Sequence, residues 1–221
     1  MTAEMNYEQA RYNMIEQQIR TWEVLDQRVL DAVGVVKRED FVPESYRRLA
    51  FADTQVAIGH NEVMMAPKVE ARMLQSLQIQ GSDTVLEIGT GSGYVTALLA
   101  RLGAWVTSVE LYPDLSAVAQ VRLKRAGIDN VTLEVGDALA NWRAPAAYDV
   151  VAVTGSLPVF TPVFNPYVKV GGRMFVIVGE APVMEALLLT RSAEEDWVRE
   201  SLFETVLPPL VGATKPKTFT L

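Results

Sequence analysis

The segment from residue 85 to residue 93 carries the pattern best suited to hold a ligand. An apolar run leads to Glu87, and a G-x-G-x-G turn follows it. Glycine has no Cβ, so such a turn bends sharply and its backbone can lie against a bound molecule. A dinucleotide site would place the third glycine one residue later, where this chain has Tyr94. The spacing, with Glu87 just before the turn, fits a cofactor that carries a positive amine and hydroxyls, such as S-adenosylmethionine (AdoMet).

Two more acidic residues stand at corresponding places after the next predicted strands. Glu110 ends the second strand, where a carboxylate can accept hydrogen bonds from both hydroxyls of a ribose. Asp137 follows the third strand and can accept from the adenine amine. Acids also mark strand ends simply as solvated loop residues, but three in consecutive units beside a glycine turn favour AdoMet binding. The predicted cofactor-binding residues are Glu87, Gly89, Thr90, Gly91, Ser92, Gly93, Glu110, Leu111, Asp137 and Ala138.

The elements that position these residues follow from the hydrophobic pattern after residue 83. Apolar runs predict strands at 84–88, 105–110, 131–135, 148–153 and 173–178, helices at 93–102 and 114–126, and a terminal hairpin near 186–191 and 198–207. Alternating strands and helices predict an α/β fold with a mostly parallel sheet and right-handed crossovers. Ligands bind such sheets beyond the carboxyl ends of the strands.

The residues before this alternating region show a different pattern. Apolar positions at helical spacing predict helices from residue 1 to about residue 50, and Asp26 can cap one of them. Residues 52 to 66 carry few periodic signals and are predicted to form a loop. Pro67 suits the first turn of the helix that follows.

Composition excludes several classes of function. The chain has 221 residues and a net charge of -7, with scattered lysines and arginines, which argues against nucleic-acid binding. It has no cysteine and one histidine, so thiolate catalysis is excluded and no metal site is expected. No signal peptide and no apolar run long enough to span a bilayer are visible, so we expect a cytoplasmic protein without membrane contact. The oligomeric state is left open.

Beyond the glycine turn, the chain resembles the protein-L-isoaspartate O-methyltransferase family. Segments that match the family's elements in consistent order are Arg38–Pro43, Ala50–Asp53, Ile58–Gly59, Leu86–Tyr94, Ala147–Asp149, Gly171–Arg173 and Val206–Leu210. The resemblance implies a Rossmann-like AdoMet-dependent methyltransferase fold, with a seven-stranded sheet flanked by helices and an N-terminal helical extension. It also implies methyl transfer to a carboxylate of an isoaspartyl-containing protein or peptide. Residues 1–66 would form the extension and the substrate loop, and residues 67–221 the AdoMet-binding core of one compact unit.

The chain departs from the family at the substrate loop. The family pattern is I-G-x-G-Q-T-I-S-Q-P, whose serine hydroxyl meets the substrate carboxylate. Here Val63 stands for the threonine, Met65 for that serine and Ala66 for the second glutamine. A carboxyl group is already ionised at neutral pH, so its methylation needs alignment rather than a base. Loss of hydrogen bonds to a charged group costs about 1.5–3 kcal/mol each and would weaken capture of isoaspartate.

Three interpretations of this loop remain open. Met64 and Met65 can simply fill gaps in the core, or the pocket is remodelled for a small apolar or aromatic metabolite. A hydroxylated aromatic would need a base, since a phenol titrates near pH 10, and His60 and Glu62 are the candidates in the loop. The third interpretation is a catalytically silent AdoMet-binding paralogue. The predicted substrate-pocket residues are His60, Val63, Met64 and Met65, and no catalytic residue is assigned beyond these candidates.

Overall fold

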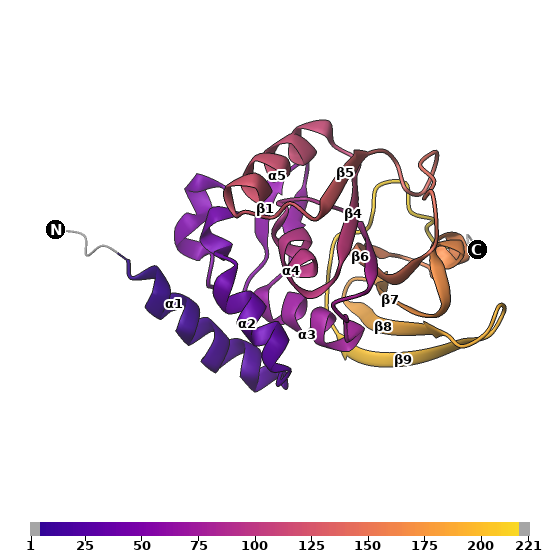
Figure 1. Ribbon diagram of the computed structural model, residues 1–221, viewed down its shortest axis with the longest axis horizontal. Helices are drawn as coiled ribbons and strands as arrows, with labels where there is room; N and C mark the ends of the chain where they lie inside the picture. Colours follow the sequence, from indigo (N-terminus) through magenta and orange to yellow (C-terminus); the bar gives the residue numbers. More distant parts are fainter. Residues whose placement is uncertain (1–4, 217–221) are drawn as a thin grey trace, which may run out of the picture.

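The computed structural model describes residues 5 to 216. Seven strands form one sheet in the order β5-β4-β3-β6-β7-β8-β9 (Figure 1). They are β3 (Thr84–Ile88), β4 (Trp105–Glu110), β5 (Val131–Val135), β6 (Tyr148–Leu157), β7 (Val168–Glu180), β8 (Val183–Arg191) and β9 (Trp197–Glu204). β3 to β7 pair in parallel, whereas β8 pairs antiparallel with both of its neighbours. The predicted α/β fold with a seven-stranded, mostly parallel sheet is confirmed.

The strand order reverses beside β3. The chain first builds outward from β3 through β4 to β5, and then returns to place β6 on the other side of β3. Neighbouring crossovers therefore leave β3 and β6 in opposite directions. A crevice opens at their carboxyl ends, which is where parallel sheets bind ligands.

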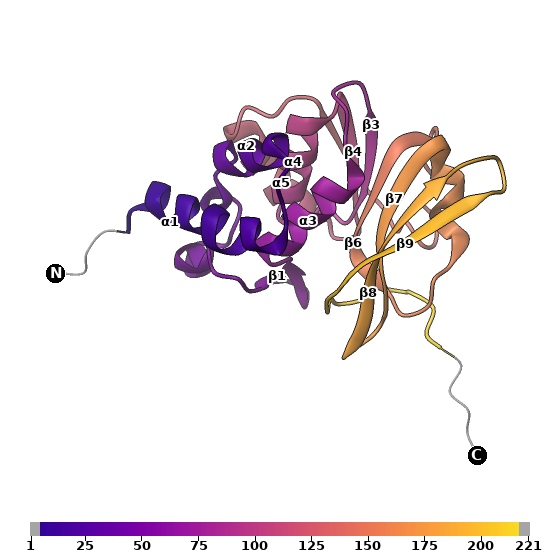
Figure 2. The same cartoon turned by 90° about the horizontal axis from the view of Figure 1, so that it is seen from below.

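The helices cover one side of this sheet. They are α1 (Tyr7–Met14), α2 (Gln27–Val35), α3 (Pro67–Leu77), α4 (Tyr94–Leu102) and α5 (Pro113–Arg125). Figure 2 shows all five gathered on one face. In β6, Val150 and Ala152 pack into the core on this face, whereas Val151 and Val153 pack into a second core on the opposite face. Burial on both faces explains why this strand is a continuous apolar run.

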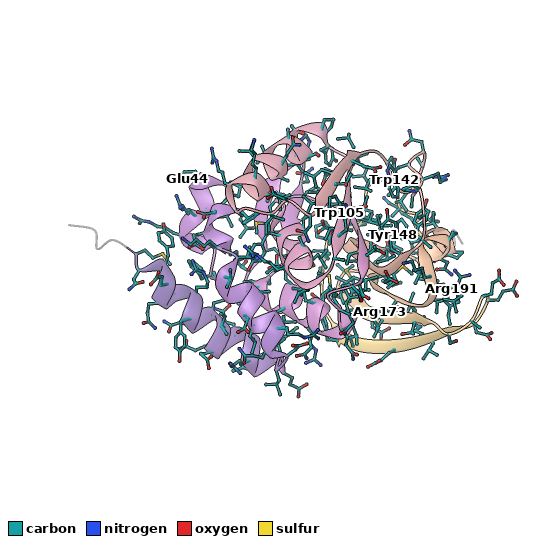
Figure 3. All side chains as sticks on the ribbon, viewed as in Figure 1. Glu44, Trp105, Trp142, Tyr148, Arg173 and Arg191 are labelled. Atoms are coloured by element: carbon teal, nitrogen blue, oxygen red, sulfur yellow. The ribbon has the colours of Figure 1, made fainter. Side chains whose placement is uncertain are left out.

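Aromatic side chains fill much of the second core. Trp142, from the loop after β5, contacts Tyr167 edge-on with 5.7 Å between ring centroids. Tyr148 joins them from the start of β6, and Trp142 and Tyr148 are labelled in Figure 3. Trp105, labelled in the same view, instead lies 45% exposed at the start of β4. This side of the sheet is covered by loops and one short helix, η5 (Pro162–Tyr167), rather than by long helices.

The N-terminal helices begin where local chemistry favours them. The side chain of Asp26 accepts a hydrogen bond from the Arg28 backbone N–H (2.9 Å), which confirms the predicted cap of α2. Pro67 occupies the first turn of α3, as its fixed φ and missing N–H favour. Short π or 3-10 segments link the helices: η1 (Ile15–Ile19), η2 (Arg20–Trp22), η3 (Arg38–Asp40) and η4 (Glu44–Leu49).

The structure differs from the sequence prediction between residues 52 and 66. A two-stranded antiparallel hairpin forms there, from β1 (Val56–Gly59) and β2 (Glu62–Met64). Its turn places His60 and Asn61 at φ of 52° and 63°, a left-handed pair typical of tight hairpin turns. The strands are short and the turn lacks the usual Asn-Gly pair, so the hydrophobic pattern gave no hairpin signal.

Candidate functional site

A cleft with about 650 Å³ of space lies at the carboxyl ends of the central strands. Its wall includes the turn after β3, the end of strand β4, the loop after β5 and part of strand β6. The β1–β2 hairpin and the chain near residue 210 provide the outer walls. The lining residues are Ile58, Glu62, Val63, Ile88, Gly89, Gly91, Val109, Glu110, Leu111, Tyr112, Leu115, Gly136, Asp137, Ala138, Leu139, Thr154, Gly155, Leu210 and Val211.

The glycine turn has a backbone that other residues would strain. Gly89 has φ of 100°, and a Cβ there would lie 2.5 Å from the hydroxyl of Thr154. That hydroxyl donates to the carbonyl oxygens of Ile88 (2.9 Å) and Gly89 (2.6 Å), so it cannot easily move away. Gly93 has φ of 84° and would press a Cβ against Ala119 at 3.0 Å. The turn can therefore lie close to a ligand only because these positions lack side chains.

Glu110 shapes the middle of the cleft. One carboxylate oxygen accepts from the Gly91 backbone N–H (2.7 Å) and the other from the Tyr112 backbone N–H (3.0 Å). Each oxygen retains a lone pair, because a carboxylate offers about four acceptor positions. Glu110 is nearly buried and lines the cleft, so it can accept further bonds from two neighbouring hydroxyls.

Asp137 borders the far end of the cleft, next to Leu111 and Ala138. One oxygen of its carboxylate accepts from the backbone N–H groups of Leu139 (2.9 Å) and Ala140 (3.1 Å). Those bonds fix the side chain, while the second oxygen makes no hydrogen bond among the described residues. An amine at the edge of an aromatic base fits such an acceptor.

Glu87 lies beneath the glycine turn and lines neither this cleft nor the smaller cavity beside it. It is fully buried and accepts from the hydroxyls of Thr96 (2.5 Å) and Ser108 (2.6 Å). Burial is the largest cause of the shift and raises the pKa of Glu87 to about 8. The two hydrogen bonds act in the opposite direction and lower this pKa. Ser108 also contacts Thr90 (2.6 Å between hydroxyl oxygens), so Glu87 supports the turn from below.

The hairpin turn contacts the chain beside the cleft, at Tyr112 and Asp114. The His60 ring stacks on Tyr112 at 4.0 Å between centroids, and its Nε2 lies 2.8 Å from the Asp114 carboxylate. His60 itself is exposed and lines neither cavity. Glu62, two residues on, does line the cleft. Burial is the main cause that raises the pKa of Glu62, and the nearby Glu110 carboxylate raises it further. His60 lowers it in part.

A second, smaller cavity, partly open to solvent, adjoins the cleft and shares several lining residues with it. Its lining residues are Ile58, Val63, Met64, Met65, Glu70, Gly89, Thr90, Gly91, Ser92, Val95 and Thr154. Three predicted substrate-pocket residues meet there, namely Val63, Met64 and Met65. The Met64 and Met65 side chains are buried and also pack into the helical core.

Glu70 in this cavity's wall, and the arginine that pairs with it, were not predicted as site residues from the sequence. Glu70 of α3 lines it and pairs with the fully buried Arg38. Arg38 also donates to the Met65 carbonyl oxygen (2.8 Å) and stacks its guanidinium over the Tyr94 ring at 4.9 Å. Burial, partly offset by Arg38, raises the pKa of Glu70 to about 7. The sequence offered a weak signal: Glu70 falls on the otherwise apolar face of α3, where a charge is unexpected.

The described part of the chain offers few alternatives to this site. Within residues 5 to 216, no three His, Asp or Glu side chains gather in a group able to hold a metal ion. No helix in the same range is long and apolar enough to cross a membrane.

The fold and the site together define an AdoMet-dependent methyltransferase. The glycine turn follows the first strand of the parallel sheet, a carboxylate ends the next strand, and an aspartate follows the third. These residues fit AdoMet, because its hydroxyls and adenine amine require such acceptors. The chain belongs to the protein-L-isoaspartate(D-aspartate) O-methyltransferase family, whose model matches residues 9–215.

Curated relatives and solved structures agree with this assignment. A protein-L-isoaspartate O-methyltransferase of Protochlamydia amoebophila is 40% identical over 90% of this chain and 95% of its own length. One from Rhodopseudomonas palustris is 39% identical over 90% and 92% of the two chains. A Plasmodium falciparum structure described as a member of the family contains S-adenosyl-L-homocysteine (AdoHcy). It matches with a TM-score of 0.77 and 19% identity over 94% of this chain and 99% of that one. At that identity the structural match shows the fold.

Proposed function

We propose that this protein transfers the AdoMet methyl group to the carboxylate of an isoaspartyl residue in a protein or peptide. The observation that carries the proposal is one cleft that is lined both by residues suited to AdoMet, such as Glu110 and Asp137, and by the hairpin and the segment near residue 210. Membership of the family, and the shared name of its relatives, supports isoaspartate as the acceptor.

The acceptor would enter between the hairpin and the segment near residue 210. That segment is fixed to β6 by Ser156, whose hydroxyl donates to the Leu207 carbonyl oxygen (2.8 Å). Two backbone bonds reinforce it, from Ser156 N–H to the Pro208 oxygen (3.0 Å) and from Leu210 N–H to the Ser156 oxygen (2.9 Å). A rigid wall on this side lets an extended peptide be held at a fixed distance from the cofactor.

Most residues that the hairpin and the segment near residue 210 place in the cleft suit alignment, and Glu62 is the ionisable one among them. Ile58, Val63, Leu210 and Val211 present apolar surface that excludes water. A carboxylate nucleophile needs no base, and AdoMet supplies an electrophilic methyl group when it is bound. Holding oxygen and methyl in line can lower the barrier by about 7–11 kcal/mol. With Met65 in place of a serine, we expect backbone N–H groups of the loop to compensate in part for the missing hydroxyl donor.

The test compares an isoaspartyl peptide with the same peptide containing normal aspartate. With enzyme in excess and AdoMet present, we expect base-labile methyl ester only on the isoaspartyl peptide. Calorimetric titration with AdoHcy runs beside it and checks that the cofactor site is intact. No ester on the isoaspartyl peptide, with AdoHcy still bound, would rule out this acceptor.

A small apolar or aromatic acceptor is the second candidate, supported by the apolar side chains of Val63 and Met65 beside the glycine turn. Under this alternative, the double substitution V63T/M65S gains isoaspartyl activity. Met65→Leu serves as the matched control, since it keeps the site apolar and of similar volume. A silent paralogue would bind AdoHcy and methylate neither class of acceptor.

A further inference from the structure

Glu70 is a carboxylate that faces the small cavity without an evident structural task there. Only 2% of the residue is exposed, and its only hydrogen-bond partner among the described residues is Arg38. The pair uses one carboxylate oxygen and leaves the other unbonded toward the cavity. A buried carboxylate is stabilised only when its remaining acceptor positions are also filled, so the second oxygen of Glu70 is suited to accept from a group that arrives from outside.

The small cavity continues the cofactor cleft. Ile58, Val63, Gly89, Gly91 and Thr154 line both spaces, so one ligand can extend from the first into the second. The larger space contains Glu110 and Asp137, the acceptors suited to ribose and adenine. The remaining end of AdoMet is an amino acid, with an ammonium and a carboxylate group.

We propose that Glu70 receives the ammonium group at the methionyl end of AdoMet, and that Arg38 positions the Glu70 carboxylate to do so. This assignment of Glu70 rests on the proposed function only in requiring that AdoMet is the cofactor. It does not depend on which molecule accepts the methyl group. It assigns the methionyl end to the small cavity and the adenosine end to the larger cleft.

The charges around the small cavity match a zwitterion. Ser92 and Val95 bring the N-terminal turn of α4 to the wall beside Glu70. Backbone N–H groups of a first helical turn lack intrahelical partners and attract anions. The α-carboxylate therefore finds donors at α4 while the ammonium finds Glu70.

Glu87, the other carboxylate near the turn, is poorly placed for this role. It lines neither cavity, and one of its oxygens is already bonded to Thr96 and Ser108. Its second oxygen is buried and has no hydrogen-bond partner among the described residues. An ammonium group would have to pass the glycine turn to reach it, whereas Glu70 already faces the cavity.

The experiment uses two ligands that differ only at the methionyl end. AdoHcy carries the ammonium and carboxylate groups, whereas 5′-methylthioadenosine carries adenosine and sulfur without them. Calorimetric titration of the wild-type protein and Glu70→Gln at pH 8 gives four dissociation constants. We expect Glu70→Gln to weaken AdoHcy about 10- to 100-fold, as loss of a hydrogen bond to a charged group predicts. Binding of 5′-methylthioadenosine should change less than twofold.

Glu39→Gln is the matched control, because Glu39 is a buried glutamate paired with Arg11 that lines neither cavity. It should leave the ratio of the two dissociation constants unchanged. If Glu70→Gln does not fold, the double substitution R38M/E70M replaces the buried pair by apolar groups, a change that proteins often tolerate. The same selective loss is expected. An unchanged AdoHcy affinity, or equal losses for both ligands, would overturn the proposal.

This result is independent of the acceptor. Selective loss of AdoHcy with no ester on the isoaspartyl peptide would leave Glu70 assigned and the proposed acceptor wrong. If the wild-type protein forms the ester and Glu70→Gln leaves the ratio of the two dissociation constants unchanged, the proposed acceptor stands and the role of Glu70 is wrong.

Discussion

Two glutamates near the glycine turn are both fully buried, and their surroundings give them different roles. Glu87 is in the middle of a buried strand, bonded to Thr96 and Ser108 below the turn. Glu70 is on a helix that packs against the turn and faces a cavity. Sequence spacing locates Glu87 before the glycines, but in a strand buried on both faces it does not determine which way the side chain points. The prediction that Glu87 contacts the cofactor therefore stays a prediction, and the geometry favours a supporting role.

The affinity of the wild-type protein for AdoHcy should rise with pH across pH 7. The pKa of Glu70 is raised to about 7 by burial, with Arg38 the charged group that faces it and the Tyr94 ring behind Arg38. Below pH 7 the carboxyl is protonated and must lose its proton before an ammonium binds. The affinity should fall up to tenfold per pH unit there. Titrations between pH 5.5 and 8.5 measure it, and Glu70→Gln should lose the part of the pH dependence that is centred near pH 7.

Glu87 should make the stability of the protein depend on pH in the opposite sense to most carboxylates. Its pKa rises from 4.5 to about 8 on folding because of burial, so the folded state keeps a proton that the unfolded state releases. The free energy of unfolding should therefore decrease as pH rises from 5 to 8, by about 1 kcal/mol per pH unit from this group. Urea unfolding at pH 5, 6, 7 and 8 measures it. Glu87→Gln should remove this part of the slope, and parallel profiles for the two proteins would contradict the assignment.

At the scale of elements, the β1–β2 hairpin links the acceptor mouth to the cofactor cleft. Its strands place Ile58, Glu62 and Val63 in the cleft wall, and its turn reaches α5 through His60. His60 thus acts outside the cavity, where it holds the hairpin down. An imidazole base inside the pocket, considered from sequence for an aromatic acceptor, has no counterpart in this geometry.

Replacing His60 should loosen the hairpin over the cofactor. His60→Ala removes both the stacking on Tyr112 and the contact with Asp114. We expect AdoHcy to dissociate about two- to tenfold faster, in line with the usual strength of an aromatic contact. His60→Phe keeps the ring and should recover most of the effect. Stopped-flow displacement measures the rates, and identical rates in all three proteins would show that the turn does not restrain the ligand.

The sequence predicted those parts of the site that depend on local order along the chain. Gly89, Glu110 and Asp137 follow buried strands at regular places, and parallel pairing brings all three to one edge. The Arg38–Glu70 pair joins residues that are far apart in sequence and on separate helices. The periodicity of apolar residues along the chain does not predict a contact between residues so far apart. The hairpin was missed for a related reason, since its short strands are stabilised by packing against the sheet rather than by their own propensity.

At the scale of the whole molecule, two segments far apart in sequence form the proposed acceptor entrance. The hairpin comes from the N-terminal part and the segment Leu207–Val211 from the C-terminal part. The side-chain amide of Gln55 joins them by donating to the Val206 carbonyl oxygen (2.6 Å). The proposed acceptor entrance therefore depends on the contacts of the segment near residue 207 with β6, whereas Gly89, Glu110 and Asp137 are held by bonds of their own.

Weakening the C-terminal segment should separate acceptor binding from cofactor binding. Ser156→Ala removes the bond from its buried hydroxyl to the Leu207 carbonyl oxygen. We expect KM for the methylated peptide to rise about three- to tenfold, the usual effect of one hydrogen bond, while the AdoHcy dissociation constant stays within twofold. Steady-state kinetics and calorimetry measure the two constants. Ser201→Ala, on the exposed strand β9, is the control, and equal changes in both constants would argue against a separate acceptor wall.

The late position of that wall has a consequence for synthesis of the protein on the ribosome. Every residue proposed here to contact AdoMet has been translated by Ala138, but the sheet is completed by β9 and the mouth only by Val211. A nascent chain whose residues 207–211 are still inside the exit tunnel would lack the proposed acceptor wall. We therefore expect such a chain to bind AdoMet before it can methylate a peptide.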